Sequence, residues 1–388
     1  MTEGVHPSAP PTDPVPREPE GTEQTRAGRH TGRRSRPWTP LAVGIAIAFL
    51  LGALVSVIPL PYAVLQPGPA TNVLGSTSGK DGAQVPRIDI AQAPTYPTTG
   101  ALDFTTVRVL GGPGYRVNAM DLLVAWISPD QDVHPAEELF PPQATKEQVA
   151  EENKAEMTSS QHEAAAVALR ATGRTVPTVV KVVQVADGAP ATGELKPGDV
   201  LISVGGVPAS DPAGVRAAIQ RVTAGQPVEV VVTRDGARTT THPKTGTTTN
   251  PDGTSRTYLG IVLSTDYDLP FPVTIDAGNV GGPSAGLMFA LGIYDKLTEG
   301  ALTGGRTIAG TGTIDDAGTV GSIGGIRQKI AGARDAGADF FLAPAGNCAD
   351  LSGGQPAGIR VVKVSAFADA LADVEAIAAG RTDDLPHC

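Results

Sequence analysis

The chain has 388 residues, of which 40% are hydrophobic, and it is rich in turn-forming residues, with 47 Gly and 34 Pro. This length allows two or three domains, each with its own core. The formal net charge is −10. Residues 1–37 hold six of the 30 basic and five of the 40 acidic residues, so the remainder carries −11. Such an acidic body argues against a nucleic-acid partner, because affinity for nucleic acid comes mainly from Lys and Arg at phosphates.

The first 60 residues predict a tail followed by a membrane anchor. Residues 1–37 are rich in Pro, Thr, Ser, Arg and Glu, a composition typical of disorder. Residues 41–58 carry no charge, and Trp38 and Tyr62 bracket them where aromatic rings favour the headgroup region of a bilayer. We therefore expect a transmembrane helix over 38–60. A cleaved signal peptide is the main alternative and a buried helix a weaker one, although the run is long and starts late for a signal peptide.

The charges around this run predict its orientation. Five arginines precede it, whereas the segment that follows, PLPYAVLQPGP at residues 59–69, is uncharged. The positive-inside rule then keeps the tail in the cytoplasm and places everything after the run outside it. The expectation is a single-pass protein of the cell membrane whose folded part is extracytoplasmic.

The two cysteines fit that location. Cys348 follows the strand-like run FFLAP in a segment rich in Gly, Pro and Asn, and Cys388 is the last residue. A helix is expected between them, over 366–379. If this helix packs beside the FFLAP strand, the C-terminal tail at residues 379–388 can return to the loop. One disulfide is then the prediction, with two unpaired thiols as the alternative.

The segment after the anchor predicts short strands and one long helix. Residues 61–97 alternate β-branched runs with Pro and Gly, which is typical of a β-rich linker, and the strongest strand is Ala101–Leu110. From Lys146 to Thr172 the pattern is helical and ends at a glycine. His162 lies on this helix with no nucleophile motif near it, so a surface role is favoured over a catalytic one.

A compact unit follows at residues 173–245. Strand-like VPTVVKVVQV and VEVVVTRDG flank a helix-forming DPAGVRAAIQRV, and residues 193–207 read GELKPGDVLISVGGV. This last stretch, with a Pro-Gly turn before an apolar strand, resembles the signature of PDZ domains. The resemblance implies a domain that binds an extended peptide as an added strand. The Gly-Leu-Gly-Phe loop of that family has no counterpart at residues 174–177 (RTVP), which leaves capture of peptide C-termini open.

Ser284 is the candidate nucleophile. It lies in the segment GGPSAG, residues 281–286, directly before the apolar run LMFALGIYDKL. A serine flanked by glycines at a strand-to-helix turn can be approached closely by a substrate. Backbone N–H groups of the oxyanion region, around Gly282 and Ala285, can then hold an oxyanion. The alternative is a structural N-cap, a position that serine fills readily.

Lys329 is the candidate base. At 100° per residue, its side chain falls on the same stripe of a predicted helix as Ile326, Ile330 and Ala333. A lysine pressed against apolar neighbours is shifted towards its neutral amine, and this form can take a proton from a serine. The alternative is a lysine whose stem is buried while its amine reaches solvent.

Together, the two segments resemble the proteolytic domain of Lon proteases. That family carries a Pro-Ser-Ala-Gly serine and a Gly-Gly-x-x-x-Lys lysine roughly as far apart as Ser284 and Lys329 are here. The resemblance implies a Ser-Lys dyad, and it makes Thr311, in the run IAGTGTI between them, the hydroxyl partner of the lysine. Lon enzymes often have an acid where this chain has Gly281, so the auxiliary acid is absent or replaced, with Asp276 as the candidate.

The likeness extends upstream of the PDZ-like unit. The strand ALDFTTVRVL and the long helix resemble the start of the Lon domain. This implies an α+β protease fold in two parts, residues 98–172 and 256–378, with the PDZ domain inserted between them. The whole resembles the membrane-anchored, PDZ-containing Lon-like proteases of bacteria. The family also implies a homo-oligomer, with a hexameric ring as the expected state.

Motifs that the sequence lacks narrow the function. It has no Gly-x-x-x-x-Gly-Lys-[Ser/Thr] loop, so no ATPase module is expected, and neither His-Glu-x-x-His nor paired Cys spacing predicts zinc. No cofactor is expected. The sequence thus predicts an ATP-independent, extracytoplasmic serine endopeptidase that acts on exported or membrane proteins, with the PDZ domain presenting the polypeptide. The alternative is a non-proteolytic membrane-anchored PDZ scaffold with a relic protease fold.

Overall fold

The computed structural model of the chain describes residues 41–47, 49–50, 59–79, 82–249, 255–352 and 357–388. The predicted tail and most of the predicted anchor lie outside these ranges, and residues 41–47 and 49–50 are helical and exposed. Within the described ranges, no helix is both long enough and apolar enough to cross a bilayer. The chain divides into two units, Met1–Leu54 and Val55–Cys388, and the second contains the two folded domains.

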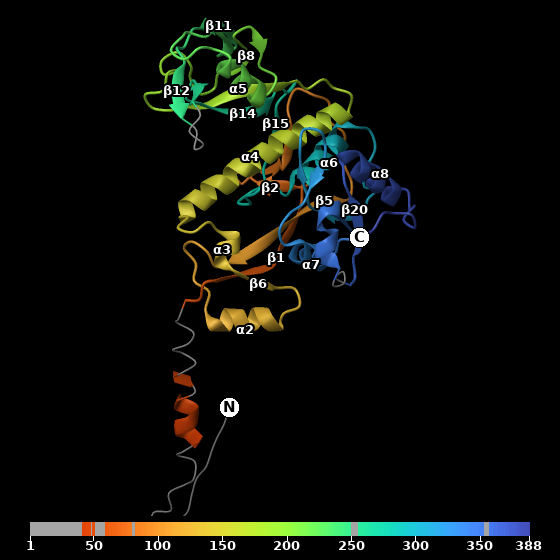
Figure 1. The fold of residues 1–388 in the computed structure, drawn as a ribbon. Coiled ribbons are helices and arrows are strands. Elements are labelled where there is room, and N and C mark those ends of the chain that lie inside the picture. The colour runs from red at the N-terminus through yellow and green to blue at the C-terminus, as the bar shows by residue number, and fades with distance from the viewer. Residues whose placement is uncertain (1–40, 48, 51–58, 80–81, 250–254, 353–356) are drawn as a thin grey trace, which may run out of the picture. The chain divides into compact units, whose positions relative to one another are not determined.

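A six-stranded mixed sheet organises the first of these domains (Figure 1). Its strands are β1 Tyr62–Asn72, β5 Ala101–Leu110, β6 Asp132–Pro135, β16 Thr307–Gly310, β19 Phe340–Pro344 and β20 Arg360–Val364. They lie in the order β20-β19-β16-β5-β1-β6. β1 pairs antiparallel with β5 and β6, whereas β16 is parallel to both β5 and β19, and β19 is parallel to β20. The β5–β16 pair joins the parts of the chain before and after the PDZ-like unit.

This sheet begins earlier in the chain than predicted. β1 lies within residues 61–97, which we expected to form a separate segment ahead of the protease fold, but it pairs with β5 along most of its length. β4 (Ile88–Ile90) likewise pairs with β15 (Val273–Ile275), which follows the PDZ-like unit. The local alternation of β-branched residues with Pro and Gly predicts strands here, but it does not encode which distant strands they pair with. The start of the protease fold at residue 98 is therefore corrected to β1.

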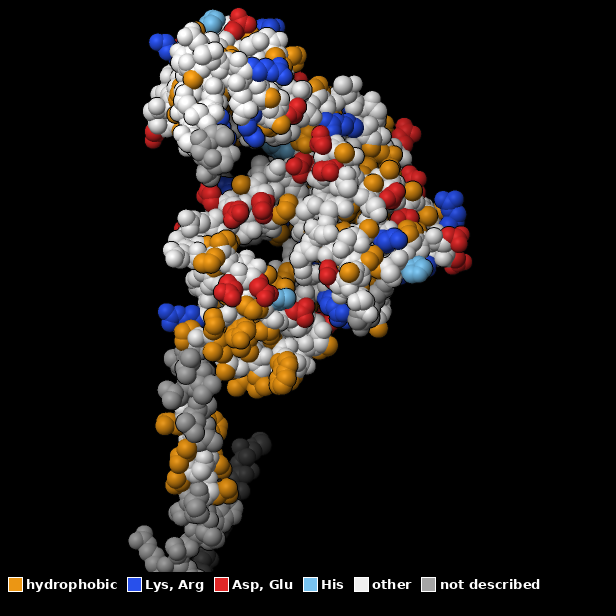
Figure 2. All heavy atoms as spheres, in the orientation of Figure 1, with side chains coloured by type: hydrophobic (Ala, Val, Ile, Leu, Met, Phe, Trp, Pro, Cys, Tyr) orange, Lys and Arg blue, Asp and Glu red, His pale blue; other side chains and the backbone are white. Residues whose placement is uncertain are grey.

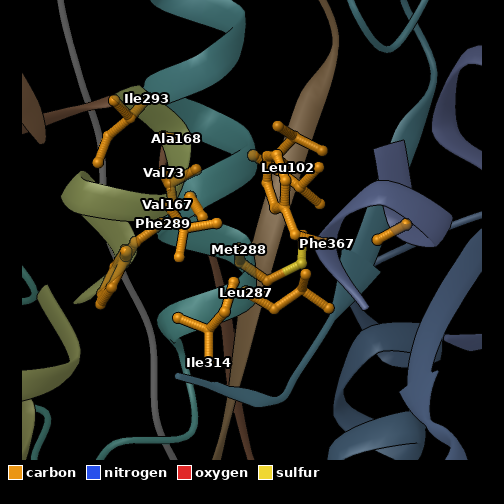
Figure 3. Packing of buried hydrophobic residues seen from close by; sticks show 14 of the residues in the cluster. Val73, Leu102, Val167, Ala168, Leu287, Met288, Phe289, Ile293, Ile314 and Phe367 are labelled. Carbon is orange, nitrogen blue, oxygen red and sulfur yellow. The ribbon is translucent and has the colours of Figure 1, made fainter. Parts of the chain in front are cut away.

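Helices cover both faces of the sheet. The main ones are α4 Lys146–Ala171, α6 Gly286–Leu297, α7 Ile326–Asp335 and α8 Phe367–Ala378. Successive residues of β19 point to opposite faces: Leu342 joins the core with α4, α6 and α8, whereas Phe341 joins a second core with α7. Helix α6 is apolar on nearly every side and is buried along almost its whole length. Figure 3 shows apolar side chains of α6 among those of α4, α8 and β5.

The second domain has a separate core and a separate sheet (Figure 1). Its elements are β7 Thr178–Val185, β8 Val200–Val204, β9 Val207–Pro208, α5 Pro212–Gln220, β10 Val230–Arg234, β11 Ala237–Thr241 and β14 Ile261–Tyr267. The sheet runs β11-β10-β8-β7-β14, with β9 paired to β8. Because β14 pairs with β7 throughout, the PDZ-like domain does not end at the predicted residue 245. It takes its last strand from the segment that was assigned to the protease.

Short elements complete the described part of the chain. They are β2 Ser76–Ser78, β3 Gln84–Pro86, α2 Ala119–Ile127, α3 Ala136–Leu139, β12 Gly246–Thr249, β13 Ser255–Tyr258, β17 Thr313–Ile314, β18 Val320–Gly321 and the 3₁₀ helix η1 Ala345–Leu351.

Cys348 of η1 forms a disulfide with Cys388, and their Cα atoms are 5.0 Å apart. The Lys363 N–H donates to the Pro386 carbonyl (2.9 Å), so the C-terminal tail lies along β20.

Candidate active site

Ser284 lies in a tight turn between β15 and α6. Ser160 of α4 donates its hydroxyl hydrogen to the Pro283 carbonyl (2.8 Å), which holds this turn against the long helix. Gly286 lies so close to Ser160 and Ile314 that a side chain at this position would meet the Ser160 hydroxyl at 2.7 Å. Helix α6 has Ala285 as its N-cap and no side-chain cap hydrogen bond. The N-cap alternative for Ser284 is therefore wrong, and its half-buried hydroxyl is left for another partner.

That partner is Lys329. Its Nζ atom lies 2.6 Å from Ser284 Oγ, although the two residues are 45 positions apart in the chain. Lys329 is only 4% exposed, on the side of α7 that also carries Ile326 and Ile330. Its amine is directed at the hydroxyls of Ser284 and Thr311 instead of projecting into solvent. Burial in these surroundings lowers the pKa of Lys329 to about 7. A large share of the lysine is then neutral near neutral pH.

Thr311 completes this group of side chains. Its hydroxyl donates to the Ser284 carbonyl (2.9 Å), and the same carbonyl accepts from the Gly312 N–H (2.8 Å). Lys329 Nζ lies 3.0 Å from Thr311 Oγ1. A hydroxyl has one proton, so Thr311 must accept from Lys329. This contact directs one N–H of the neutral amine towards Thr311 and leaves its lone pair free for the Ser284 hydroxyl.

The structure divides the predicted oxyanion region. The Gly282 N–H donates to the Asn153 carbonyl of α4 (2.9 Å), so it is not free for an oxyanion, and this part of the prediction is wrong. The Ala285 N–H, and that of Ser284 itself, have no acceptor among the described residues. Both lie at the start of a buried helix, whose dipole favours negative charge there. The candidate oxyanion donors are thus the N–H groups of Ser284 and Ala285, with Ser284 in place of Gly282.

Two adjoining hollows lie beside the segments that precede the Ser284 turn and helix α7. One, of about 450 Å³, is lined by Gly324 and Gly325 directly before α7, and the other, of about 750 Å³, by residues 275–281 directly before the Ser284 turn. Val107 and Val109 of β5 line both of them, as does Asn153. β5 is paired with β16 only as far as Phe104, so the rest of its edge on that side has no strand partner among the described residues. The surface suits an extended polypeptide.

Two other candidate residues lie away from the dyad. The Asp276 carboxylate accepts from the Gly278 N–H (2.8 Å) within its own turn, and among the described residues it makes no hydrogen bond to Ser284 or Lys329. His162 is exposed, with its ring nitrogen 3.0 Å from Asp266 of β14. Within the described ranges, no cluster of three or more His, Cys, Asp or Glu side chains could hold a metal ion.

A candidate peptide groove of the second domain lies at a place that the sequence analysis missed. A hollow of about 420 Å³ is lined by Arg216 and Ile219 of α5 and by residues 256–263. Its strand, β14, is at the edge of the sheet and can accept another strand, whereas β7 lies between β8 and β14 and cannot. A carboxylate loop is therefore expected before β14, and not at residues 174–177 before β7. The available signal was Leu259-Gly260-Ile261, which precedes the alternating pattern of β14.

Comparisons with known proteins identify the two domain types. A PDZ domain model matches residues 151–244, and a model of the Lon protease (S16) C-terminal proteolytic domain matches residues 270–378. A Lon protease of Citrifermentans bemidjiense is 38% identical over 95 residues, which are 24% of this chain and 12% of that protein. The chain therefore matches only a small part of this curated relative's length.

Solved structures align with about a fifth of the chain. The PDZ domain of an SdrC-like protein from Listeria monocytogenes is 21% identical, with 22% of this chain and 85% of that chain covered and a TM-score of 0.20. A solution structure from Geobacillus thermodenitrificans, GtR34C, is 24% identical, with coverages of 22% and 94% and a TM-score of 0.19. Alignments of this quality do not bear on the function.

Proposed function

We propose that this chain, as a PDZ-containing Lon-like protease, hydrolyses peptide bonds through a Ser284–Lys329 dyad, outside the cytoplasm and without ATP. The observation that carries the proposal is the 2.6 Å separation of Lys329 Nζ and Ser284 Oγ in a site where the lysine is 4% exposed. Burial shifts the amine towards its neutral form, which is the form a general base requires.

The proton then follows a short path. The neutral amine of Lys329 takes the Ser284 hydroxyl proton while Oγ bonds to the carbonyl carbon of the substrate. The N–H groups of Ser284 and Ala285 hold the resulting oxyanion. The C–N bond breaks as the lysine ammonium returns its proton to the leaving amine. The neutral lysine next deprotonates a water molecule, which hydrolyses the acyl-enzyme and restores Ser284.

The alternative is a scaffold with a relic protease fold. Burying a lysine amine is unfavourable, and it has no purpose in a protein that needs only its fold. Here the amine is buried and lies within hydrogen-bonding distance of two hydroxyls, Ser284 and Thr311. An apolar residue at this position would pack equally well at lower cost. This favours the enzyme over the relic.

Location and energy supply rest on the sequence. The uncharged run 41–58, with arginines before it, supports a single membrane span that exports the folded part. The Cys348–Cys388 disulfide supports an oxidising compartment. The absence of a nucleotide-binding loop from the sequence supports cleavage without ATP. The substrates proposed are exported or membrane polypeptides, presented by the PDZ domain through β-strand addition on β14.

A serine-directed covalent probe tests the dyad. Full-length protein should gain the mass of one peptidyl boronate or β-lactone at Ser284 and should cleave an unfolded polypeptide. Ser284→Ala and Lys329→Met should each lose activity by several orders of magnitude, and the double variant should be no worse than either, because the two groups act as a unit. Ser322→Ala, on the loop before α7, is the matched control. Near-normal turnover of Lys329→Met would contradict the proposal.

A further inference from the structure

Helix α2, with the sequence AMDLLVAWI, is apolar on almost every side. Its single charge is Asp121, whose carboxylate accepts from the Asn118 N–H (3.0 Å) in the capping box that starts the helix. One narrow side packs on the domain, where Ala125 and Leu122 join a small core with Val64 of β1. A helix that is apolar all round is normally buried on all sides. This one is not.

The outer side of α2 is exposed. With Ala125 set at 0°, every residue that falls between 100° and 260° on the helix is apolar. Trp126 is 85% exposed and Ile127 is 74% exposed. The exposed large apolar residues of this patch are Tyr115, Met120, Leu123, Val124, Trp126 and Ile127. Figure 2 shows apolar side chains gathered at the end of the domain where Figure 1 labels α2. A contiguous patch of this kind marks an interaction surface.

Chain connectivity indicates what covers the patch. The Leu60 N–H donates to the Val117 carbonyl (2.9 Å), and the next residue, Asn118, is the N-cap of α2. Leu60 follows the uncharged run 41–58 by only two residues, which span at most about 7 Å. The surface of a bilayer that holds this run is therefore close to Leu60. Leu60 in turn is hydrogen-bonded to Val117, two residues before α2 begins. The exposed side carries no charge, and a tryptophan on it suits the headgroup region.

We propose that α2 is a membrane-docking helix, whose exposed apolar side inserts into the lipid surface from which the chain emerges. It lies in the interface plane with Trp126 at the boundary between headgroups and acyl chains. The occupant of the patch is thus lipid and not a second copy of this chain. The anchor and α2 together make two attachments, which fix the orientation of the proteolytic domain on the bilayer. This inference rests on the membrane anchor of the proposed function, but not on the dyad.

The chain has two tryptophans, Trp38 and Trp126, which makes the inference directly measurable. The full-length Trp38→Phe variant, reconstituted into phosphatidylcholine–phosphatidylglycerol vesicles with brominated acyl chains, has Trp126 as its only tryptophan. We expect strong quenching of its fluorescence by the bromine atoms and blue-shifted emission. The Trp126→Phe variant carries only Trp38 and reports separately on the anchor.

A matched pair of charge substitutions identifies the surface. Added to Trp38→Phe, Ile127→Glu should lose most of the quenching, because a carboxylate on the apolar side opposes insertion. Val183→Glu, at an exposed apolar residue of β7 in the second domain, should leave it unchanged. Both sites are exposed, so neither change should unfold the protein. Equal quenching in the two variants would overturn the assignment to α2.

The remaining outcomes separate the inference from the anchor and from the enzyme. Quenched Trp38 with unquenched Trp126 overturns membrane docking and leaves the anchor in place. If neither is quenched, both fail. Blue-shifted Trp126 that lipid does not quench, and that shifts back on dilution in detergent, means that a second copy covers the patch, which also overturns the proposal. Peptide cleavage measured on the same vesicles tests the dyad independently of all three.

Discussion

Thr311 has one hydroxyl proton, which it donates in a hydrogen bond to the Ser284 carbonyl. The hydroxyl donates to the Ser284 carbonyl and accepts from Lys329, so one side chain stabilises the nucleophile's turn and orients the base. Thr311 is completely buried, and its contacts leave it no freedom to rotate away. One contact is to the amine of Lys329, and the other is to a backbone carbonyl, so Thr311 acts through these groups and not on the substrate itself. Thr311 is therefore a positioning residue, and the dyad depends on its hydroxyl more than on its volume.

Replacing Thr311 separates these two contributions. Thr311→Val keeps the shape but removes the hydroxyl, so Lys329 loses its acceptor and we expect kcat to fall by about 10- to 100-fold, the cost of one lost buried hydrogen bond. Thr311→Ser restores the hydroxyl and should recover most of the rate. Cleavage assays with thermal unfolding of both variants are the measurement. Equal rates in Thr311→Val and Thr311→Ser would show that the hydroxyl does not position the base.

The pH dependence of cleavage follows from the burial of Lys329. The base acts only when neutral, and its pKa is lowered to about 7. Activity should therefore rise tenfold per pH unit below pH 7 and level off above it, as the protonated fraction disappears. The pH profile of kcat/KM for a peptide without titratable groups measures this. A rise that continues to pH 10, the range of an ordinary lysine, would contradict the assignment of Lys329 as the base.

At the scale of elements, the segment that carries the disulfide contacts the loop before α7, the helix that carries Lys329. Asn347 precedes Cys348 in η1; its side chain accepts from the Ile323 N–H (2.9 Å) and donates to the Ile323 carbonyl (2.8 Å). Cys388 packs against the core that contains Ile326 and Ile330 of α7. The crosslink therefore stabilises the C-terminal tail and also the surface on which α7 begins.

Reduction of the disulfide should lower stability more than catalytic rate. The bond closes a loop of 40 residues, which in the chain-entropy model stabilises the fold by about 3–4 kcal/mol. Lys329 itself is held by Ser284 and Thr311, so kcat at a temperature where the protein stays folded should change little. Thermal unfolding with and without reductant measures the effect, with the Cys348→Ser, Cys388→Ser double variant as the control that reductant leaves unchanged. Two alkylatable thiols in non-reduced protein would disprove the bond.

At the scale of the whole molecule, the second domain interrupts the first without breaking its sheet. α4 carries contacts to both: Ser160 holds the Ser284 turn, while His162 and Arg170 contact Asp266 and Thr178 of the PDZ-like sheet. Helix α4 thus contacts β14 through His162 and also lines, with Asn153, both hollows near the Ser284 turn. This is the arrangement expected if the PDZ domain presents a polypeptide to the protease.

Assembly is the prediction that belongs to this scale. The likeness to Lon proteolytic domains leads us to expect a homo-oligomer, and a hexamer in particular. Light scattering on the full chain in detergent, corrected for the detergent mass, should give about six times the monomer mass. Activity should fall on dilution if the ring is needed to complete the site. Full activity from a monomer would contradict the expectation.

The sequence alone was sufficient for the domain types and for the residues of the candidate site. Ser284, Lys329 and the PDZ strand at residues 200–204 are visible because each depends on a short segment: a glycine-flanked turn, the face of one helix, or a turn followed by an apolar strand. Helical periodicity places Lys329 with Ile326 and Ile330, but it does not predict that Gln328, on the opposite side of α7, is buried as well. Fold class and both domains could therefore be predicted before any coordinate was known.

Only the tertiary structure decided the features that depend on distant pairings. β1 belongs to the protease sheet because it pairs with β5, and the peptide edge is β14 because β7 has partners on both sides. The Gly282 N–H is occupied by a carbonyl that lies more than a hundred residues earlier in the chain. The sequence left the pairing of the cysteines open, and the fold decides it by bringing their Cα atoms to 5.0 Å. Local periodicity determines which face of an element is apolar, but only packing determines which neighbour, if any, covers it.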